Sequence, residues 1–137
     1  MTNTLIRITY RTASNYKAHE EVVLPGPISE PTIGLIAAHA VDGYQVIPSE
    51  VGLPSLAEEL IDACGAFDES DFVAHVELDA WLEGLPSPTE LLTTRPATVS
   101  FTAEAFGAMV AQAAFDIQHE MDRLAEYECA PPGRPSA

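Results

Sequence analysis

Histidine and carboxylate side chains are the residues of this sequence whose types and spacing suit metal binding or acid–base chemistry. His75, Glu77 and Asp79 alternate along the chain, so on a strand they would share one face with neighbours about 7 Å apart. Two of them would suit a cation with help from elsewhere, and the alternative is a solvated polar strand face. The pair at 119–120 begins like the zinc pattern H-E-x-x-H, but position 123 is Arg. We therefore predict no metal and no cofactor.

Signatures of a catalytic nucleophile are also missing. Serine, histidine and aspartate are present, but no G-x-S-x-G elbow presents a serine. Cys64 has Ala63 and Gly65 as neighbours and no nearby cation that would favour its thiolate. The sequence predicts no catalytic residue and favours a protein that is not an enzyme. An enzyme whose site has no recognisable motif remains an alternative.

Charge is the strongest signal in the sequence. The 137 residues contain 21 acids and 6 Lys or Arg, which gives a net charge of −15. Between residues 18 and 94 there are 15 acids and no Lys or Arg. Such a surface repels nucleic acid and anionic membranes and suits a basic partner. The alternative is a charge that only keeps the protein soluble.

We predict that acids of this base-free stretch form a partner-binding surface. The candidate residues are Glu58, Glu59, Asp62, Asp68, Glu69, Asp71, Glu77 and Asp79. Carboxylates bind the same Arg and Lys side chains that hold phosphates. The leading hypothesis is therefore a binding or inhibitory protein, in its sharpest form a nucleic-acid mimic of the anti-restriction or anti-CRISPR type that blocks a basic nucleic-acid-binding enzyme. The alternative is an accessory or scaffold module that binds another protein, or itself as a homodimer, through apolar surface.

A second candidate surface is the polar segment 11–18, in a chain otherwise poor in bases. Its candidate contact residues are Arg11, Asn15, Tyr16 and Lys17. The segment either contacts a partner or pairs with the protein's own acidic face. Trp81 falls on the polar side of a predicted strand, so it is either an exposed interface anchor or, as we favour, a buried ring in another register.

The elements that must position these residues indicate an α+β fold. The predicted strands are 4–10, 21–24, 44–47, 72–82 and 98–101, and the predicted helices begin after Ser29, Ser55 and Thr102. For 72–82 a helix is the alternative, because Leu78, Leu82 and Leu85 also stand at helical spacing. The last helix is expected to run from 103 to 126 without a break. We predict a small, mainly antiparallel sheet with helices on one face and a long C-terminal helix.

Two segments carry a resemblance. Residues 10–17 read Tyr-Arg-Thr-Ala-Ser-Asn-Tyr-Lys, and residues 46–54 read Val-Ile-Pro-Ser-Glu-Val-Gly-Leu-Pro. They resemble a group of small bacterial proteins that share Y-R-x-x-S-N-Y-K and I-P-x-x-V-G-L-P. The likeness covers residues 5–60 and continues more loosely to residue 82. It implies no activity, cofactor or site.

Length and cysteine content complete the expectations. We predict one domain over 1–130 and a flexible Pro-rich tail over 131–137. Cys64 and Cys129 form no C-x-x-C pair, so we expect reduced thiols. The N-terminus lacks the apolar run of a signal peptide, and no stretch has the length to span a bilayer. We therefore expect a cytoplasmic protein with no membrane contact.

Overall fold

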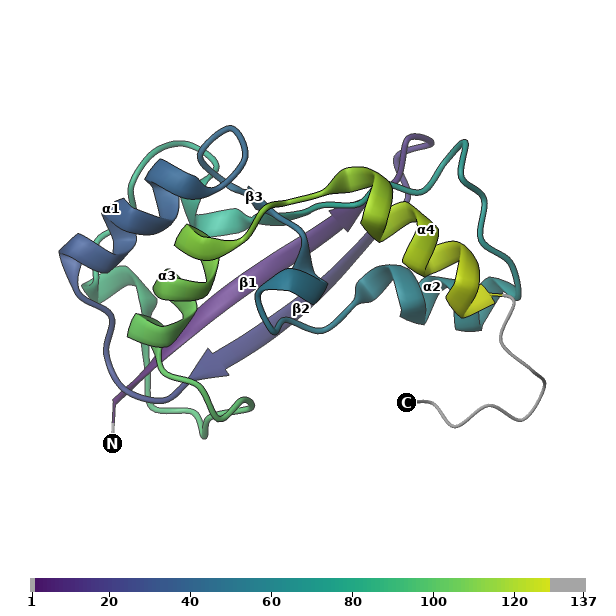
Figure 1. The fold of residues 1–137 in the computed structure, drawn as a ribbon. Coiled ribbons are helices and arrows are strands. Elements are labelled where there is room, and N and C mark those ends of the chain that lie inside the picture. The colour runs from purple at the N-terminus through teal and green to yellow at the C-terminus, as the bar shows by residue number, and fades with distance from the viewer. Residues whose placement is uncertain (1, 129–137) are drawn as a thin grey trace.

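An antiparallel hairpin opens the protein, in a computed structural model that describes residues 2–128 (Figure 1). Strand β1 spans Asn3–Arg11 and strand β2 spans Lys17–Leu24. The pairing continues from Thr4 with Leu24 to Arg11 with Lys17. The structure confirms the predicted hairpin and lengthens its second strand.

The two faces of the hairpin differ in polarity. Ile6, Ile8 and Tyr10 are at most 1% exposed and share the inner face of the sheet. Arg7 and Arg11 are exposed on the other side, which we call the outer face. This alternation is the period-two pattern of a sheet with one buried side.

Three short strands complete the sheet. Strand β4 (Val76–Leu78) pairs with the middle of β1, strand β3 (Gln45–Val46) pairs with β4, and strand β5 (Leu92–Thr93) pairs with the start of β1. All of these pairs are antiparallel, and the order is β2-β1-β4-β3 with β5 off this path. β1 is therefore the central strand.

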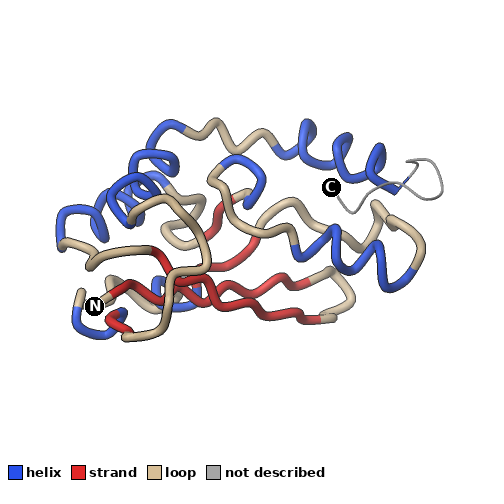
Figure 2. Tube along the Cα trace, turned by 90° about the horizontal axis from the view of Figure 1, so that it is seen from below, coloured by secondary structure: helices blue, strands red, loops and turns tan. Residues whose placement is uncertain are grey.

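Four α-helices lie on one side of the sheet (Figure 2). They are α1 (Glu30–His39), α2 (Leu56–Cys64), α3 (Ala103–Gln112) and α4 (Ile117–Glu128). α1 packs against α3 and α2 packs against α4, so the two pairs occupy opposite ends of the molecule (Figure 1). The predicted α+β class, with helices on one face of an antiparallel sheet, is confirmed.

Three of the helices begin at the caps that the sequence predicted. The hydroxyls of Ser29, Ser55 and Thr102 each accept a hydrogen bond from the backbone N–H three residues later. Each bond pairs an amide that the first turn of a helix leaves without a partner. These local signals place the starts of α1, α2 and α3.

The single helix predicted over 103–126 is wrong in extent, because residues 113–116 separate α3 from α4. Phe115 has a φ of +50°, which no right-handed helix allows. The carboxylate of Glu50 accepts hydrogen bonds from the backbone N–H of Phe115 at 2.9 Å and of Asp116 at 3.0 Å. A side chain distant in sequence thus pairs the amides at the break.

The strand predicted over 72–82 is also shorter than expected, because only β4 has strand pairing. It is followed by the 3₁₀ helix η2, Asp79–Trp81, which turns the chain toward the core. Trp81 is 3% exposed, and its Nε1–H donates a hydrogen bond to the carbonyl of Ile33 at 3.1 Å. Burial of Trp81 is confirmed, and the interface-anchor alternative is wrong.

The strand predicted over 98–101 is absent, although this segment lies beside β2. The N–H of Thr98 donates to the carbonyl of Val23 at 2.8 Å, and the N–H of Val23 donates to Thr98 Oγ1 at 2.9 Å. Two more 3₁₀ helices, η1 (Pro48–Glu50) and η3 (Thr89–Leu91), complete the described elements.

Candidate functional site

Carboxylates gather at the end of the molecule formed by α2, residues 65–71 and α4 (Figure 1). We call this region the acidic end. Its described acidic side chains are Glu58, Glu59, Asp62, Asp68, Glu69, Asp71, Glu120, Asp122 and Glu126. Tyr127 of α4 donates its hydroxyl proton to the carboxylate of Asp62 on α2, at 2.9 and 3.0 Å from the two oxygens. The fold therefore brings the predicted acids from Glu58 to Asp71 into one region.

Acids of α4 belong to the same region, although they were not among the predicted residues. Asp122 and Glu126 are exposed and stand four residues apart, so they share one face of the helix. That spacing was visible in the sequence. Their nearness to α2 was not, because it depends on the break between α3 and α4.

Arg123 is the one Lys or Arg within the described parts of these three segments, and carboxylates surround it. Its Nε and Nη2 donate to the two oxygens of Glu120, each at 2.8 Å, and its Nη1 donates to Glu58. Glu120 is 2% exposed and also accepts a hydrogen bond from Ser49 at 2.6 Å. The bonds to Glu120, more than those to Glu58, hold the pKa of Arg123 above its usual value.

This network joins α4 to α2 and to η1, and it compensates the buried charge of Glu120. It also keeps the only described base of the acidic end occupied by the protein's own carboxylates. Among the remaining acids there, Glu59, Asp62, Asp68, Glu69, Asp122 and Glu126 are exposed, while Asp71 is half-buried against the β1–β2 loop.

The acids of this end differ in how they are held. Asp68 accepts hydrogen bonds from the N–H and the hydroxyl of Ser70, at 3.0 and 2.6 Å, and these bonds lower the pKa of Asp68. Partial burial, followed by the charges of Glu20 and Asp62, raises the pKa of Glu59. Burial is the larger cause of this shift, and the two neighbouring carboxylates add like-charge repulsion to it.

Two predicted acids lie elsewhere, on the outer face of the sheet. Glu77 pairs with Arg11 at 3.3 Å, and Asp79 accepts a hydrogen bond from Thr9 at 2.7 Å. Both are engaged within the protein, and Glu77 lies opposite Thr9 in the register of β1 and β4. The structure separates them from the acidic end.

Most of the protein's bases also lie on the outer face. These residues are Arg7, Arg11, Lys17 and Arg95. Glu21, opposite Arg7, accepts a bond from Arg7 at 2.6 Å and from Arg95 at 2.7 Å, and these bonds lower its pKa. Charge is therefore divided between a mixed outer face and an acidic helical side.

The candidate contact loop joins β1 to β2. Its predicted residues were Arg11, Asn15, Tyr16 and Lys17. Arg11 donates to Asn15 at 3.1 Å as well as pairing with Glu77, and Asp71 accepts bonds from the N–H and hydroxyl of Ser14 at 2.6 and 3.0 Å. These contacts favour the alternative in which the loop pairs with the protein's own acids, while Tyr16 stays 52% exposed.

His75 does not join Glu77 and Asp79. Burial lowers the pKa of His75, and the charges that oppose this shift belong to Asp42, Glu50 and Glu120. Its Nε2 is buried and makes no hydrogen bond with any described group. Within residues 2–128, no three His, Cys, Asp or Glu side chains are grouped so that they could hold a metal ion.

Cys64 is exposed at the last position of α2, at the acidic end. The second cysteine, Cys129, and the predicted tail at 131–137 lie outside the described residues. None of the helices that the structure describes combines the length and apolar composition needed to cross a membrane.

Comparison with models of known protein families, with curated proteins and with solved structures gave no match. The resemblance of residues 10–17 and 46–54 to small bacterial proteins stays a prediction. In the structure the first segment forms the end of β1 and the turn into β2, and the second runs from β3 through η1.

Proposed function

We propose that this protein binds a basic protein through the acidic end, in its sharpest form by occupying the nucleic-acid site of an enzyme. One observation carries the proposal: acids from α2, residues 65–71 and α4 lie together, while the only described base among them is enclosed by Glu58 and Glu120. Exposed carboxylates in such a cluster can engage the Arg and Lys side chains that otherwise hold phosphates.

The acids best suited to an outside partner are the exposed ones that have no bond to the rest of the protein in the hydrogen-bond network above. Glu59, Glu69 and Glu126 meet this condition. By contrast, Glu58 holds Arg123 and Asp71 holds the β1–β2 loop, so their neutralisation would also disturb the fold. Glu59 and Glu69 belong to the predicted surface and Glu126 is added to it, and all three can be changed without that cost.

The test is a triple variant, Glu59→Gln, Glu69→Gln and Glu126→Gln, in a pull-down from cell extract at low and high salt. We expect retention of the basic partner to fall by roughly 3- to 100-fold, since each exposed ion pair contributes about 0.2–1 kcal/mol. Added duplex DNA should compete for the partner that the unchanged protein retains. The fold should become slightly more stable, because like-charge repulsion is relieved.

The matched control removes the same charge at three exposed positions outside the acidic end, as Asp42→Asn, Glu104→Gln and Asp116→Asn. This control should retain the partner. Equal loss in both triple variants would show that only net charge matters, and no loss in the first would contradict a role for the acidic end.

A further inference from the structure

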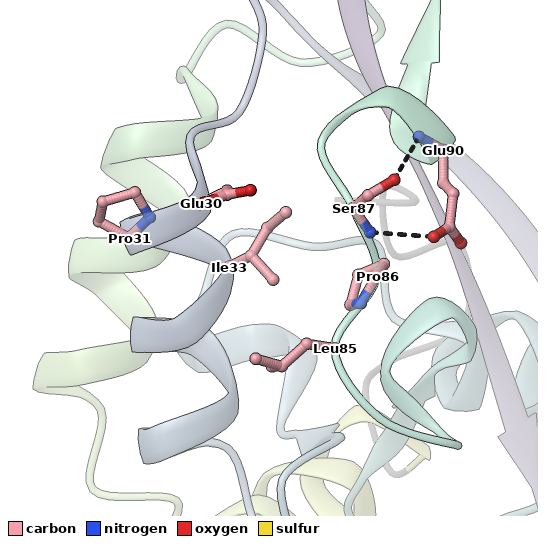
Figure 3. A pocket seen from close by; sticks show the side chains of 7 residues that line it. All are labelled: Glu30, Pro31, Ile33, Leu85, Pro86, Ser87 and Glu90. Carbon is pink, nitrogen blue, oxygen red and sulfur yellow. Dashed lines mark hydrogen bonds between the residues drawn. The ribbon is translucent and has the colours of Figure 1, made fainter.

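A hollow of about 620 Å³ lies between the start of α1 and the chain that follows η2 (Figure 3). Ile33, Leu85 and Pro86 give it an apolar lining. Ile33 is 2% exposed and forms part of its floor, whereas Leu85 is 65% exposed, more than any other large apolar side chain that the structure describes. The volume is in the range of sites that bind a ligand or a side chain, about 300–1,000 Å³.

A second hollow lies on the other side of the same turn. It shares Leu85, Pro86 and Glu90 with the first and adds Leu82, which is 43% exposed. Leu82 and Leu85 thus both line the second hollow, and Leu85 lines the first as well. The turn at 82–86 therefore presents two exposed leucines at one hollow.

Carboxylates border the leucines. Glu30 extends from the first turn of α1 toward the hollow (Figure 3), and Glu83 is exposed between the two leucines in sequence. No Lys or Arg occurs between residues 18 and 94, the stretch that supplies every residue of both hollows. The rim is therefore negative, with no base of its own segment to neutralise it.

The chain directly after the turn is fixed by two hydrogen bonds at the start of η3. Oε1 of Glu90 accepts a hydrogen bond from the N–H of Ser87 at 3.0 Å, and Ser87 Oγ accepts one from the N–H of Glu90 at 3.3 Å (Figure 3). A surface that is already ordered loses less conformational entropy on binding.

We propose that this surface, the leucine cleft (Ile33, Leu82, Leu85 and Pro86, with Glu30 and Glu83 at its rim), binds an amphipathic basic segment of a partner protein. Apolar side chains of the segment pack against the leucines and enter the hollow, and its Lys or Arg side chains pair with the rim carboxylates. The cleft lies beside α1, at the opposite end of the molecule from α2 and α4 (Figure 1), so the proposal does not depend on the acidic end.

The test measures binding of a fluorescent amphipathic Leu/Lys peptide by anisotropy, with a Ser/Lys peptide of equal charge beside it. Both peptides are tested on the protein and on the Glu59→Gln, Glu69→Gln, Glu126→Gln variant, which removes three of the nine described carboxylates of the acidic end. We expect the Leu/Lys peptide to bind both proteins more tightly than the Ser/Lys peptide. Backbone amide NMR signals of the non-proline residues within 30–33 and 82–90 should shift on its addition.

The variant Leu85→Ser should weaken binding of the Leu/Lys peptide by roughly tenfold, since a central apolar contact is lost. Ile117→Ser is the matched control, because Ile117 on α4 is 54% exposed and lines neither hollow. It should leave binding unchanged, and both variants should unfold at the same temperature as the unchanged protein.

Equal binding of the two peptides, or equal effects of Leu85→Ser and Ile117→Ser, would overturn the leucine cleft. So would amide shifts confined to α2 and α4, and that result would support the acidic end instead. Leu85→Ser can also be used in the pull-down of the basic partner. If this variant loses the peptide but retains the basic partner, the result would support the leucine cleft and the acidic end as two separate surfaces.

Discussion

At the scale of single residues, the burial of His75 makes the stability of the protein depend on pH. Burial lowers its pKa below the ordinary value of 6.5, although Asp42, Glu50 and Glu120 act in the opposite direction. The folded protein therefore favours neutral His75. In the unfolded chain the ring takes up a proton at a higher pH, so protonation favours unfolding.

We expect the free energy of unfolding to fall as the pH drops below 6.5, and to lose part of this slope in His75→Gln. Above pH 6.5 the ring is mostly neutral in both states, so the two proteins should differ little in pH dependence. Urea unfolding at a series of pH values measures this slope. His39→Gln, at an exposed position at the end of α1, is the control and should keep the slope of the unchanged protein. An identical slope in His75→Gln would contradict the assignment.

At the scale of elements, α1 and α3 approach each other through a glycine. A Cβ built at Gly107 of α3 would lie 2.7 Å from Cγ2 of Thr32 on α1, closer than two carbon atoms can pack. Gly34 of α1 is also within a helix, but no atom lies within 4 Å of the position its Cβ would take. Substitution of Gly107 therefore tests the close packing of α1 against α3, whereas substitution of Gly34 tests helix propensity alone.

We predict opposite effects for the two alanine substitutions. Gly107→Ala should lower the free energy of unfolding by about 1–3 kcal/mol, because α1 and α3 must move apart. Gly34→Ala should raise it by about 0.5–1 kcal/mol, since alanine is the better helix former. Urea unfolding measures both, and stabilisation by both would show that the helices are not in close contact.

At the scale of the whole molecule, charge is unevenly distributed. Bases and acids pair on the outer face, where Glu21 joins Arg7 and Arg95, while the acidic end has its single described base enclosed. A net charge of −15 then acts mainly as repulsion among the acids of the helical side. Salt should weaken this repulsion more than it weakens the exposed ion pairs.

We expect Tm to rise when the salt concentration is raised from about 0.01 to 0.1 M, which shortens the screening length from about 30 to about 10 Å. The Glu59→Gln, Glu69→Gln, Glu126→Gln variant should show a smaller rise, because it has less repulsion to screen. Differential scanning calorimetry measures both. A Tm that falls with salt would mean that the ion pairs of the outer face dominate.

Local signals in the sequence were sufficient for much of the fold. The polar alternation of residues 4–10 predicted β1, and the hydroxyls of Ser29, Ser55 and Thr102 predicted the starts of three helices. These features depend on neighbours within one turn or one strand, so a linear reading contains the needed information. The charge of the protein and the base-free stretch from 18 to 94 were equally plain.

Only the tertiary structure decided the rest, because each remaining feature depends on a partner distant in sequence. Glu50 pairs the amides at the break between α3 and α4, and the carbonyl of Ile33 receives the indole of Trp81. Ion pairs with Arg123 engage Glu58 and Glu120 within the fold, whereas other acids of the same end remain exposed. Residue types along the chain determined how many carboxylates the protein has, and long-range packing determined which of them stay exposed.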